Sequence, residues 1–287
     1  MRLNAALIAL AVSACSGPAE KAQSATPPVS PKPMLIGVST HFGQGWPERY
    51  WTTLGSVPAP LVRDSVSWKS IETIPGQYSF TGATVGHVRR LCATGHRAVL
   101  VLLPKHPAYD GNFTVYSLAG RTAFGSYVAA LAREFGTCLA GVQIGNEING
   151  PGNVTGPAAT DRPASYTAIL QAVHAALANM SPRPLILGGS TNTIGTGFLE
   201  QVFKAGALDY MDAVVVHPYR KDPANVDWEL GLLREAMARH GAVKPIWANE
   251  FSIDTTDTVA AADYLAKMLV QLSAAGVEAG FWYALVD

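Results

Sequence analysis

The sequence predicts a (β/α)8 barrel, and two observations support this fold. Eight short apolar segments alternate with seven longer segments whose apolar residues recur three and four positions apart. That alternation indicates parallel strands joined by helices, and eight strands in about 250 residues are typical of such a barrel. An open doubly wound sheet is the alternative fold. It is disfavoured because residues 37–45, GVSTHFGQG, do not form a glycine-rich phosphate loop after the first strand.

The predicted strands are short apolar runs. They cover residues 35–39, 61–64, 98–103, 141–147, 185–189, 213–217, 245–250 and 280–285. The predicted helices cover residues 47–54, 82–94, 119–135, 164–180, 197–204, 226–240 and 258–275. The barrel therefore apparently lacks its last helix. We expect a fragment of a longer chain, or another element that covers the apolar stretch 277–286.

The composition disfavours nucleic acid as a partner. Lys and Arg number 21, as do Asp and Glu, so the formal net charge is zero. A chain without an excess of basic residues lacks the positive charge that binds a phosphate backbone. A neutral polymer or a small molecule is the easier partner.

The N-terminus predicts export. Residues 1–15 carry one Arg, an apolar run too short to span a bilayer as a mature helix, and then small residues, which is typical of a secretory signal. The sequence VSAC ending at Cys15 resembles a bacterial lipobox, in which the cysteine is lipidated. A plain signal peptide is the alternative interpretation.

Residues 16–33 are rich in Pro, Ser and Ala and cannot bury a core, so they predict a disordered tether to a catalytic barrel over 34–287. We therefore expect an exported lipoprotein, periplasmic or on the cell surface, attached to a bacterial membrane by its lipid alone. In an exported chain Cys92 and Cys138 either form a disulfide or remain as two buried thiols.

The residues that end the strands carry the chemistry, because the loops after the strands form the active face of a barrel. These residues are Arg63, Asn146 and Glu147, His217 and Tyr219, Asn249 and Glu250, and Trp282 and Tyr283. After the third strand, Lys105, His106 and Tyr109 either touch substrate or form loop surface, and we favour loop surface. Packing alone does not explain two glutamates and several other polar residues at the strand ends, so a functional role is favoured.

Paired carboxyl groups predict glycoside hydrolysis, in which one protonates the leaving oxygen while the other attacks the anomeric carbon. Glu250, near Arg63 and a tyrosine hydroxyl, is expected to stay charged. Glu147 is expected to lie in a less polar pocket that raises its pKa. For hydrolysis with retention the two carboxyl groups should lie about 5 to 5.5 Å apart.

The remaining strand-end residues are predicted to bind substrate. Asn146 is suited to hydrogen-bond the sugar hydroxyl beside the reacting carbon. Trp282 offers a flat apolar face for a sugar ring, or else fills the end of the barrel. Arg63, His217 and Tyr219 complete the predicted substrate site.

Other chemistries fit the sequence less well. The histidines lack close metal-ligand spacing, and there is no paired-cysteine site, so no catalytic metal is expected. The Gly-x-Ser-x-Gly pattern of serine hydrolases does not occur. We expect no cofactor.

These motifs resemble the clan A retaining glycoside hydrolases. The matching stretches are Arg63, GNE at 145–147, HPY at 217–219, NE at 249–250 and FWY at 281–283. Residues 63–80, RDSVSWKSIETIPGQYSF, are similar to a signature of families 39, 42 and part of family 5, and the chain resembles family 39-like bacterial proteins most. The resemblance implies that Glu147 is the acid/base and Glu250 the nucleophile.

The sequence thus predicts an O-glycosyl hydrolase that acts on a β-linked oligo- or polysaccharide, with exopolysaccharide among the candidate substrates. Two alternatives remain open. One is a polysaccharide-binding lipoprotein without catalysis. The other is a transglycosylase that uses the same residues.

Overall fold

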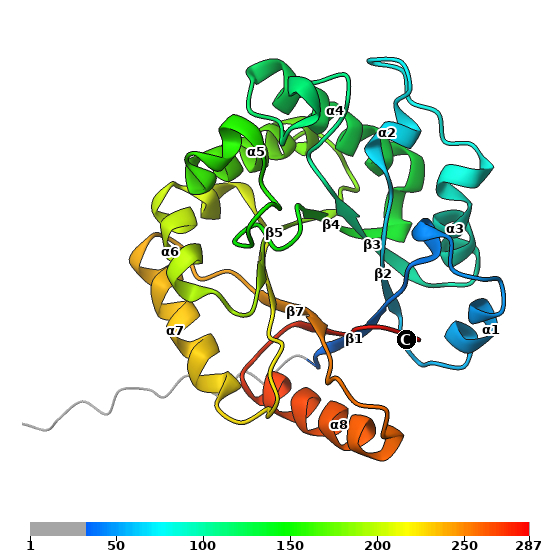
Figure 1. The fold of residues 1–287 in the computed structure, drawn as a ribbon, viewed down its shortest axis with the longest axis vertical. Coiled ribbons are helices and arrows are strands. Elements are labelled where there is room, and N and C mark those ends of the chain that lie inside the picture. The colour runs from blue at the N-terminus through cyan, green and yellow to red at the C-terminus, as the bar shows by residue number, and fades with distance from the viewer. Residues whose placement is uncertain (1–32, 287) are drawn as a thin grey trace, which may run out of the picture. The chain divides into compact units, whose positions relative to one another are not determined.

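The barrel predicted from the sequence is present. The structure is a computed structural model that describes residues 33–286, so Cys15 and the predicted signal and tether up to residue 32 lie outside it. Eight parallel strands pair in sequence order, and β1 closes the barrel against β8 (Figure 1). They are β1 Leu35–Ser39, β2 Leu61–Ser65, β3 Arg97–Leu102, β4 Leu139–Ile144, β5 Leu185–Asn192, β6 Ala213–His217, β7 Ile246–Phe251 and β8 Ala279–Trp282.

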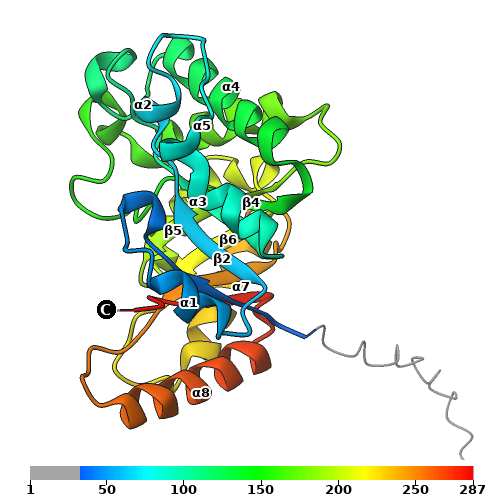
Figure 2. The same ribbon diagram turned by 90° about the vertical axis from the view of Figure 1, so that its right-hand side faces the viewer.

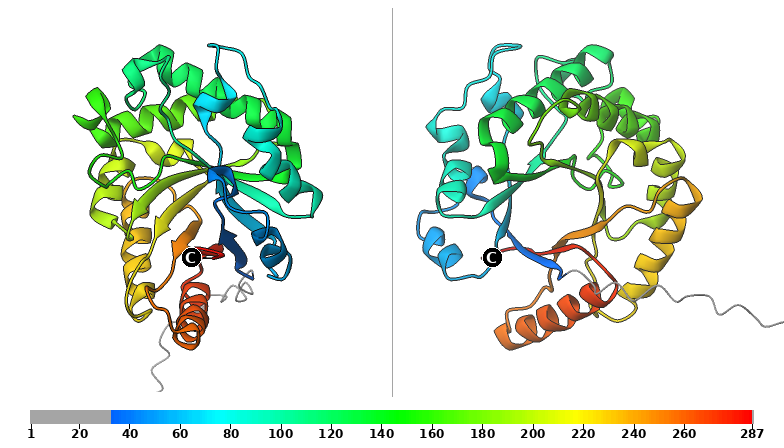
Figure 3. Two further views of the ribbon diagram at one scale, coloured as in Figure 1. Left: turned by 45° about the vertical axis from the view of Figure 1, so that its right-hand side comes forward. Right: turned by 180° about the vertical axis from the view of Figure 1, so that it is seen from behind.

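Helices surround the strands on the outside (Figures 1 and 3). They are α1 Tyr50–Gly55, α2 Trp68–Ile71, α3 Gly82–Ala93, α4 Leu118–Phe135, α5 Arg162–Leu177, α6 Thr196–Lys204, α7 Val226–Arg239 and α8 Thr258–Ala274. All seven predicted helices are present. The sequence missed α2, because a single turn is too short to show helical periodicity. Within residues 33–286 no helix follows β8, as predicted.

Two strands end three residues earlier than predicted. Strand β4 ends at Ile144 because Gly145 has a φ of 76°, a left-handed conformation that leaves the strand. Strand β8 ends at Trp282. As a result, Asn146 and Glu147 stand on a loop that begins directly at the mouth of the barrel.

The lower interior of the barrel is apolar. It is filled by Leu61, Val99, Ala140, Leu187, Ala213, Val215, Trp247, Ala279 and Phe281. Gly37 makes room for this layer, since a Cβ there would lie 2.3 Å from the Phe281 ring. A layer of large, close-packed side chains is what holds such a barrel together.

Above this layer the interior becomes polar. Because inward-facing residues alternate along a strand, the next inward residue after Leu61 is Arg63, after Val215 it is His217, and after Trp247 it is Asn249. All three polar side chains are buried. On each of these three strands, the inward side chains change from apolar to polar within two residues. The polar side chains therefore lie at the carboxyl end of the barrel.

A disulfide joins Cys92, near the end of α3, to Cys138, just before β4, and the two Cα atoms are 5.6 Å apart. Both cysteines lie in the outer shell, away from the barrel interior; Figure 2 shows α3 there, in side view. Among the helices of residues 33–286, none is long and apolar enough to cross a membrane.

Candidate active site

A cleft of about 910 Å³ lies over the carboxyl ends of the strands. Five predicted site residues meet at it. Arg63, Asn146, Glu147, Tyr219 and Glu250 line the cleft. His217 lies beneath it, buried, with its ring directed at both glutamates.

Glu250 is held by two donors. The Arg63 guanidinium lies 2.5 Å from one of its carboxylate oxygens, and both side chains are almost fully buried. The Tyr219 hydroxyl donates to the other oxygen at 2.9 Å. Burial and the adjacent Glu250 charge raise the pKa of Tyr219, so this hydroxyl keeps its proton and remains a donor.

Glu147 stands in a different environment. Its side chain is 25% exposed, against 8% for Glu250. One carboxylate oxygen accepts a 3.0 Å hydrogen bond from Asn192 and lies 3.4 Å from Nδ1 of His217. Its backbone φ is 46°, in the left-handed region that non-glycine residues seldom adopt.

The predicted rise in the pKa of Glu147 is wrong for this structure. The contact with His217 is the largest influence and lowers the pKa, burial opposes it, and the Asn192 hydrogen bond lowers it further. The sequence placed Glu147 in a less polar pocket, but the fold surrounds the carboxylate with donors that stabilise its charged form.

The two carboxylates are close. One ligand atom each from Glu147, His217 and Glu250 lies within 4.8 Å of the others. Nδ1 of His217 is 3.4 Å from Glu147 and 3.6 Å from Glu250, so the imidazole sits between them. These three groups are also of the types that coordinate divalent cations.

Gln143 is a central residue that the sequence analysis missed. Its side-chain oxygen accepts from Arg63 Nε at 2.8 Å and from Asn249 at 2.6 Å. Its amide nitrogen donates to the Asn146 side chain at 2.9 Å, which also accepts from Arg63 at 3.0 Å. A buried amide thus fixes Arg63 and Asn146 relative to each other. The only sequence signal was one polar residue between Val142 and Ile144.

The prediction that Trp282 binds substrate is contradicted. Trp282 points outward and packs against Phe251 and Tyr264. Tyr283 lines the cleft instead, with its ring 5.4 Å from that of His41. The reason is alternation: Phe281 faces the interior, so Trp282 faces out and Tyr283 faces in.

The residues after β3 divide into two groups. His106 Nε2 lies 2.8 Å from the backbone oxygen of Glu72, and Tyr109 donates to the Glu72 carboxylate at 2.5 Å. Trp68 binds the same carboxylate at 2.5 Å, so these residues brace the loop after β2. Lys105, expected to be plain loop surface, is exposed but also lines the cleft.

Asn192 was also missed. The sequence ended the fifth strand at residue 189, whereas β5 continues to Asn192 and so reaches Glu147. The glycines at 188 and 189 hid this continuation.

Sequence comparison does not place the chain in a family. No protein-family model matches it, and no curated protein sequence matches it.

Comparison with solved structures finds glycoside hydrolases with a similar fold. A family 39 glycoside hydrolase from Bacteroides cellulosilyticus WH2 has a TM-score of 0.70 at 18% identity, over 88% of this chain and 56% of its own. An exo-β-1,4-mannosidase from an Opitutaceae bacterium has 0.63 at 20% identity, over 88% of this chain and 52% of its own. A family 39 β-xylosidase from Caulobacter crescentus has 0.67 at 15% identity, over 89% of this chain and 63% of its own.

The chain therefore has the barrel fold that these glycoside hydrolases share. It spans less than two thirds of the length of each of the three.

Proposed function

We propose that this protein is a retaining glycoside hydrolase that acts on a β-linked oligo- or polysaccharide, with exopolysaccharide among the candidates. The observation that carries the proposal is the pair of carboxylates. Oxygens of Glu147 and Glu250 lie within 4.8 Å of each other, on the mouth of one barrel. That spacing suits a nucleophile with an acid/base, since inverting enzymes hold their carboxyl groups about 6.5 to 9.5 Å apart to admit a water.

The environments of the two glutamates divide the roles. Arg63 and Tyr219 fix the orientation of the Glu250 carboxylate, and the guanidinium balances its charge. The carboxylate is thus oriented for attack on the anomeric carbon. Glu147 donates a proton to the leaving oxygen while the bond to Glu250 forms. Glu147 then takes a proton from a water, which attacks the anomeric carbon and releases Glu250. We assign Asn146, His217 and Tyr219 to substrate contact or to holding the glutamates.

The lowered pKa of Glu147 in the free protein is compatible with an acid role. Burial already acts to raise this pKa and is outweighed by the His217 and Asn192 contacts. A sugar in the cleft excludes water from a side chain that is now 25% exposed, which strengthens the influence of burial. We therefore expect substrate binding to favour the protonated form.

The decisive experiment is Glu250→Gln. The amide keeps the shape of the side chain but cannot form the glycosyl ester, so kcat should fall by about 10⁴-fold or more. The measurement is release of reducing sugar from a panel of β-linked polysaccharides, with product stereochemistry followed by NMR.

Glu134→Gln is the matched control, because Glu134 forms an ion pair with Arg89 on the outer surface and should leave kcat unchanged. Full activity of Glu250→Gln would refute its role as nucleophile. A wild-type protein that binds glycans but releases no sugar would identify a binding protein instead.

We also propose that the protein is exported and anchored through a lipid on Cys15. The signal-like residues 1–15 and the lipobox-like VSAC support this, and a disulfide between Cys92 and Cys138 is typical of an oxidising compartment. A Cys15→Ala variant should leave the membrane fraction. Retention of that variant on membranes would refute the lipid anchor.

A further inference from the structure

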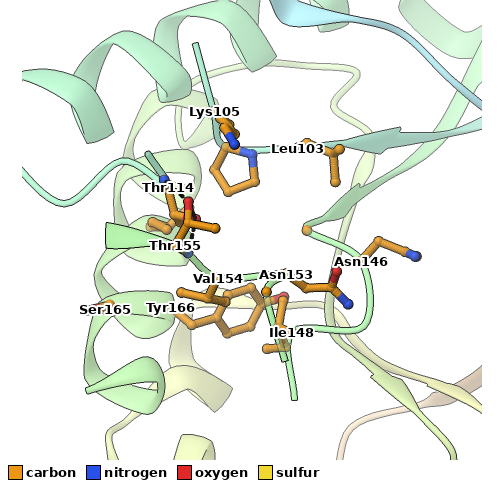
Figure 4. Close-up of a pocket in the computed structure, with 14 residues that line it drawn as sticks. Leu103, Lys105, Thr114, Asn146, Ile148, Asn153, Val154, Thr155, Ser165 and Tyr166 are labelled. Carbon is orange, nitrogen blue, oxygen red and sulfur yellow. Dashed lines mark hydrogen bonds between the residues drawn. The ribbon is translucent and has the colours of Figure 1, made fainter. Parts of the chain in front are cut away.

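A second cavity, of about 260 Å³, lies beside the catalytic cleft (Figure 4). It is formed between the loops that follow β3 and β4. Leu103, Lys105 and Asn146 line both the cavity and the cleft, so the two hollows adjoin at these residues. Because Asn146 lines both hollows and directly precedes Glu147, the cavity adjoins the cleft close to the proposed acid/base.

The cavity has an apolar floor. Ile148, Val154 and Ile169 line it together with the ring of Tyr166. The Tyr166 hydroxyl donates to the Ile144 backbone at 2.7 Å and accepts from the Gly189 backbone at 3.0 Å, so the ring is fixed. A hollow of this size that combines an apolar floor with polar side chains, among them Asn146 and Asn153, is suited to a small ligand unit such as one sugar ring.

The walls of the cavity are fixed in advance. Thr114 and Thr155 exchange two hydrogen bonds between backbone N–H and side-chain hydroxyl, at 3.1 and 2.9 Å, which tie the two loops together. The ring of Phe113 lies on Gly156, where a Cβ would be 2.4 Å from it. Loops held in this way lose little entropy when a ligand binds.

The rim of the cavity carries positive charge. Lys105 stands on the β3 side, across the cavity from Tyr166 and Ile148 (Figure 4). A second lysine, Lys69, lines the adjoining cleft. Neither forms an ion pair with an acidic side chain of residues 33–286.

The acidic residues of the cleft do not neutralise these lysines. Asp64 is buried and accepts hydrogen bonds from Thr40, from the backbone of Phe42 and Gly43, and from its neighbour Ser65. Glu250 is paired with Arg63, and Glu147 accepts a hydrogen bond from Asn192 and lies beside His217. An ammonium group at the mouth of a cavity thus has no carboxylate partner there within the described chain.

We propose that this cavity binds a uronic acid unit of the substrate, adjacent to the sugar that reacts, with its carboxylate on Lys105. The proposal rests on the proposed function, since it names the class of glycan for the same cleft. The C–H face of the ring packs on the apolar floor, and the ammonium of Lys105 donates a charge-assisted hydrogen bond to the carboxylate.

Binding to matched polymers tests the proposal. The probes are glucuronoxylan, alginate and polygalacturonate, each beside its carboxyl-reduced form, in affinity gel electrophoresis of the Glu250→Gln protein. We expect at least one native polymer to be bound about tenfold more tightly than its reduced form, as suits a hydrogen bond to a charged group. Adding Lys105→Met should abolish that difference, whereas Lys204→Met, which removes a lysine of α6 outside both hollows, should preserve it.

Two outcomes would overturn the proposal. One is equal retardation of the protein, or none, in native and reduced forms of all three polymers. The other is a Lys105→Met variant that loses affinity equally for both forms. Because the assay measures binding without turnover, a wild-type protein that fails to release sugar would defeat the proposed function and leave this test intact.

Discussion

The lower and upper halves of the barrel interior are built from the same strands but differ in kind. Below, Val99, Leu187 and Phe281 fill the space with apolar atoms. Above, Arg63 and Gln143 form a hydrogen-bonded network with the glutamates at its rim. The lower half stabilises the fold by burying apolar surface, whereas the upper half depends on hydrogen bonds and an ion pair between buried polar groups. The comparison separates residues that hold the barrel from residues that do chemistry.

The largest effect is expected from Arg63→Met, which removes the partner of buried Glu250. Leaving that charge unpaired should cost about 3–5 kcal/mol of unfolding free energy and also abolish turnover. Urea unfolding and a sugar-release assay measure the two effects.

Arg183→Met gives the contrast, since the Arg183 pair with Asp212 is partly exposed and should be worth about 0–1 kcal/mol. If the two variants lost the same unfolding free energy, the buried ion pair would contribute no more to stability than the partly exposed one.

Phe281→Ala should affect stability alone. Removing a fully buried ring from the lower layer is expected to cost about 3–5 kcal/mol through a cavity, with the pH dependence of kcat/KM unchanged. Trp228→Ala removes an aromatic side chain that is 64% exposed and should change stability by about 0.5 kcal/mol or less. A shifted pH profile for Phe281→Ala would show that the two halves are coupled.

The smallest effect is expected from His217→Leu, as a change in pH dependence. His217 is the largest cause of the lowered pKa of Glu147, so its loss should raise that pKa. A general acid works while protonated, and activity is lost as pH rises through its pKa. The alkaline limb of kcat/KM should therefore move to higher pH.

Tyr219→Phe is the control for that shift, because Tyr219 contacts Glu250 and is not among the influences on Glu147. The alkaline limb should stay in place for this variant. A limb that moves to lower pH in His217→Leu would contradict the assignment of Glu147 as the acid.

The strands and helices could be predicted because their apolar patterns are local. The choice between Trp282 and Tyr283 could not, since three consecutive aromatic residues show no contrast of polarity to fix which one faces inward. Gln143 was missed for a related reason, because one amide in an apolar strand gives no sign of the partners it meets on β2 and β7. The pKa of Glu147 depends on His217, which is 70 positions away and is brought near only by closure of the barrel.

The left-handed backbone of Glu147 has a consequence for how this chain would respond to mutation. A carboxylate residue held at a φ of 46° costs on the order of 1–3 kcal/mol that glycine would not. Folding and chemistry therefore favour different residues at the same position. A Glu147→Gly protein should melt at a higher temperature than the wild type while failing to protonate a leaving group; a lower melting temperature would show that the side-chain contacts outweigh the backbone cost.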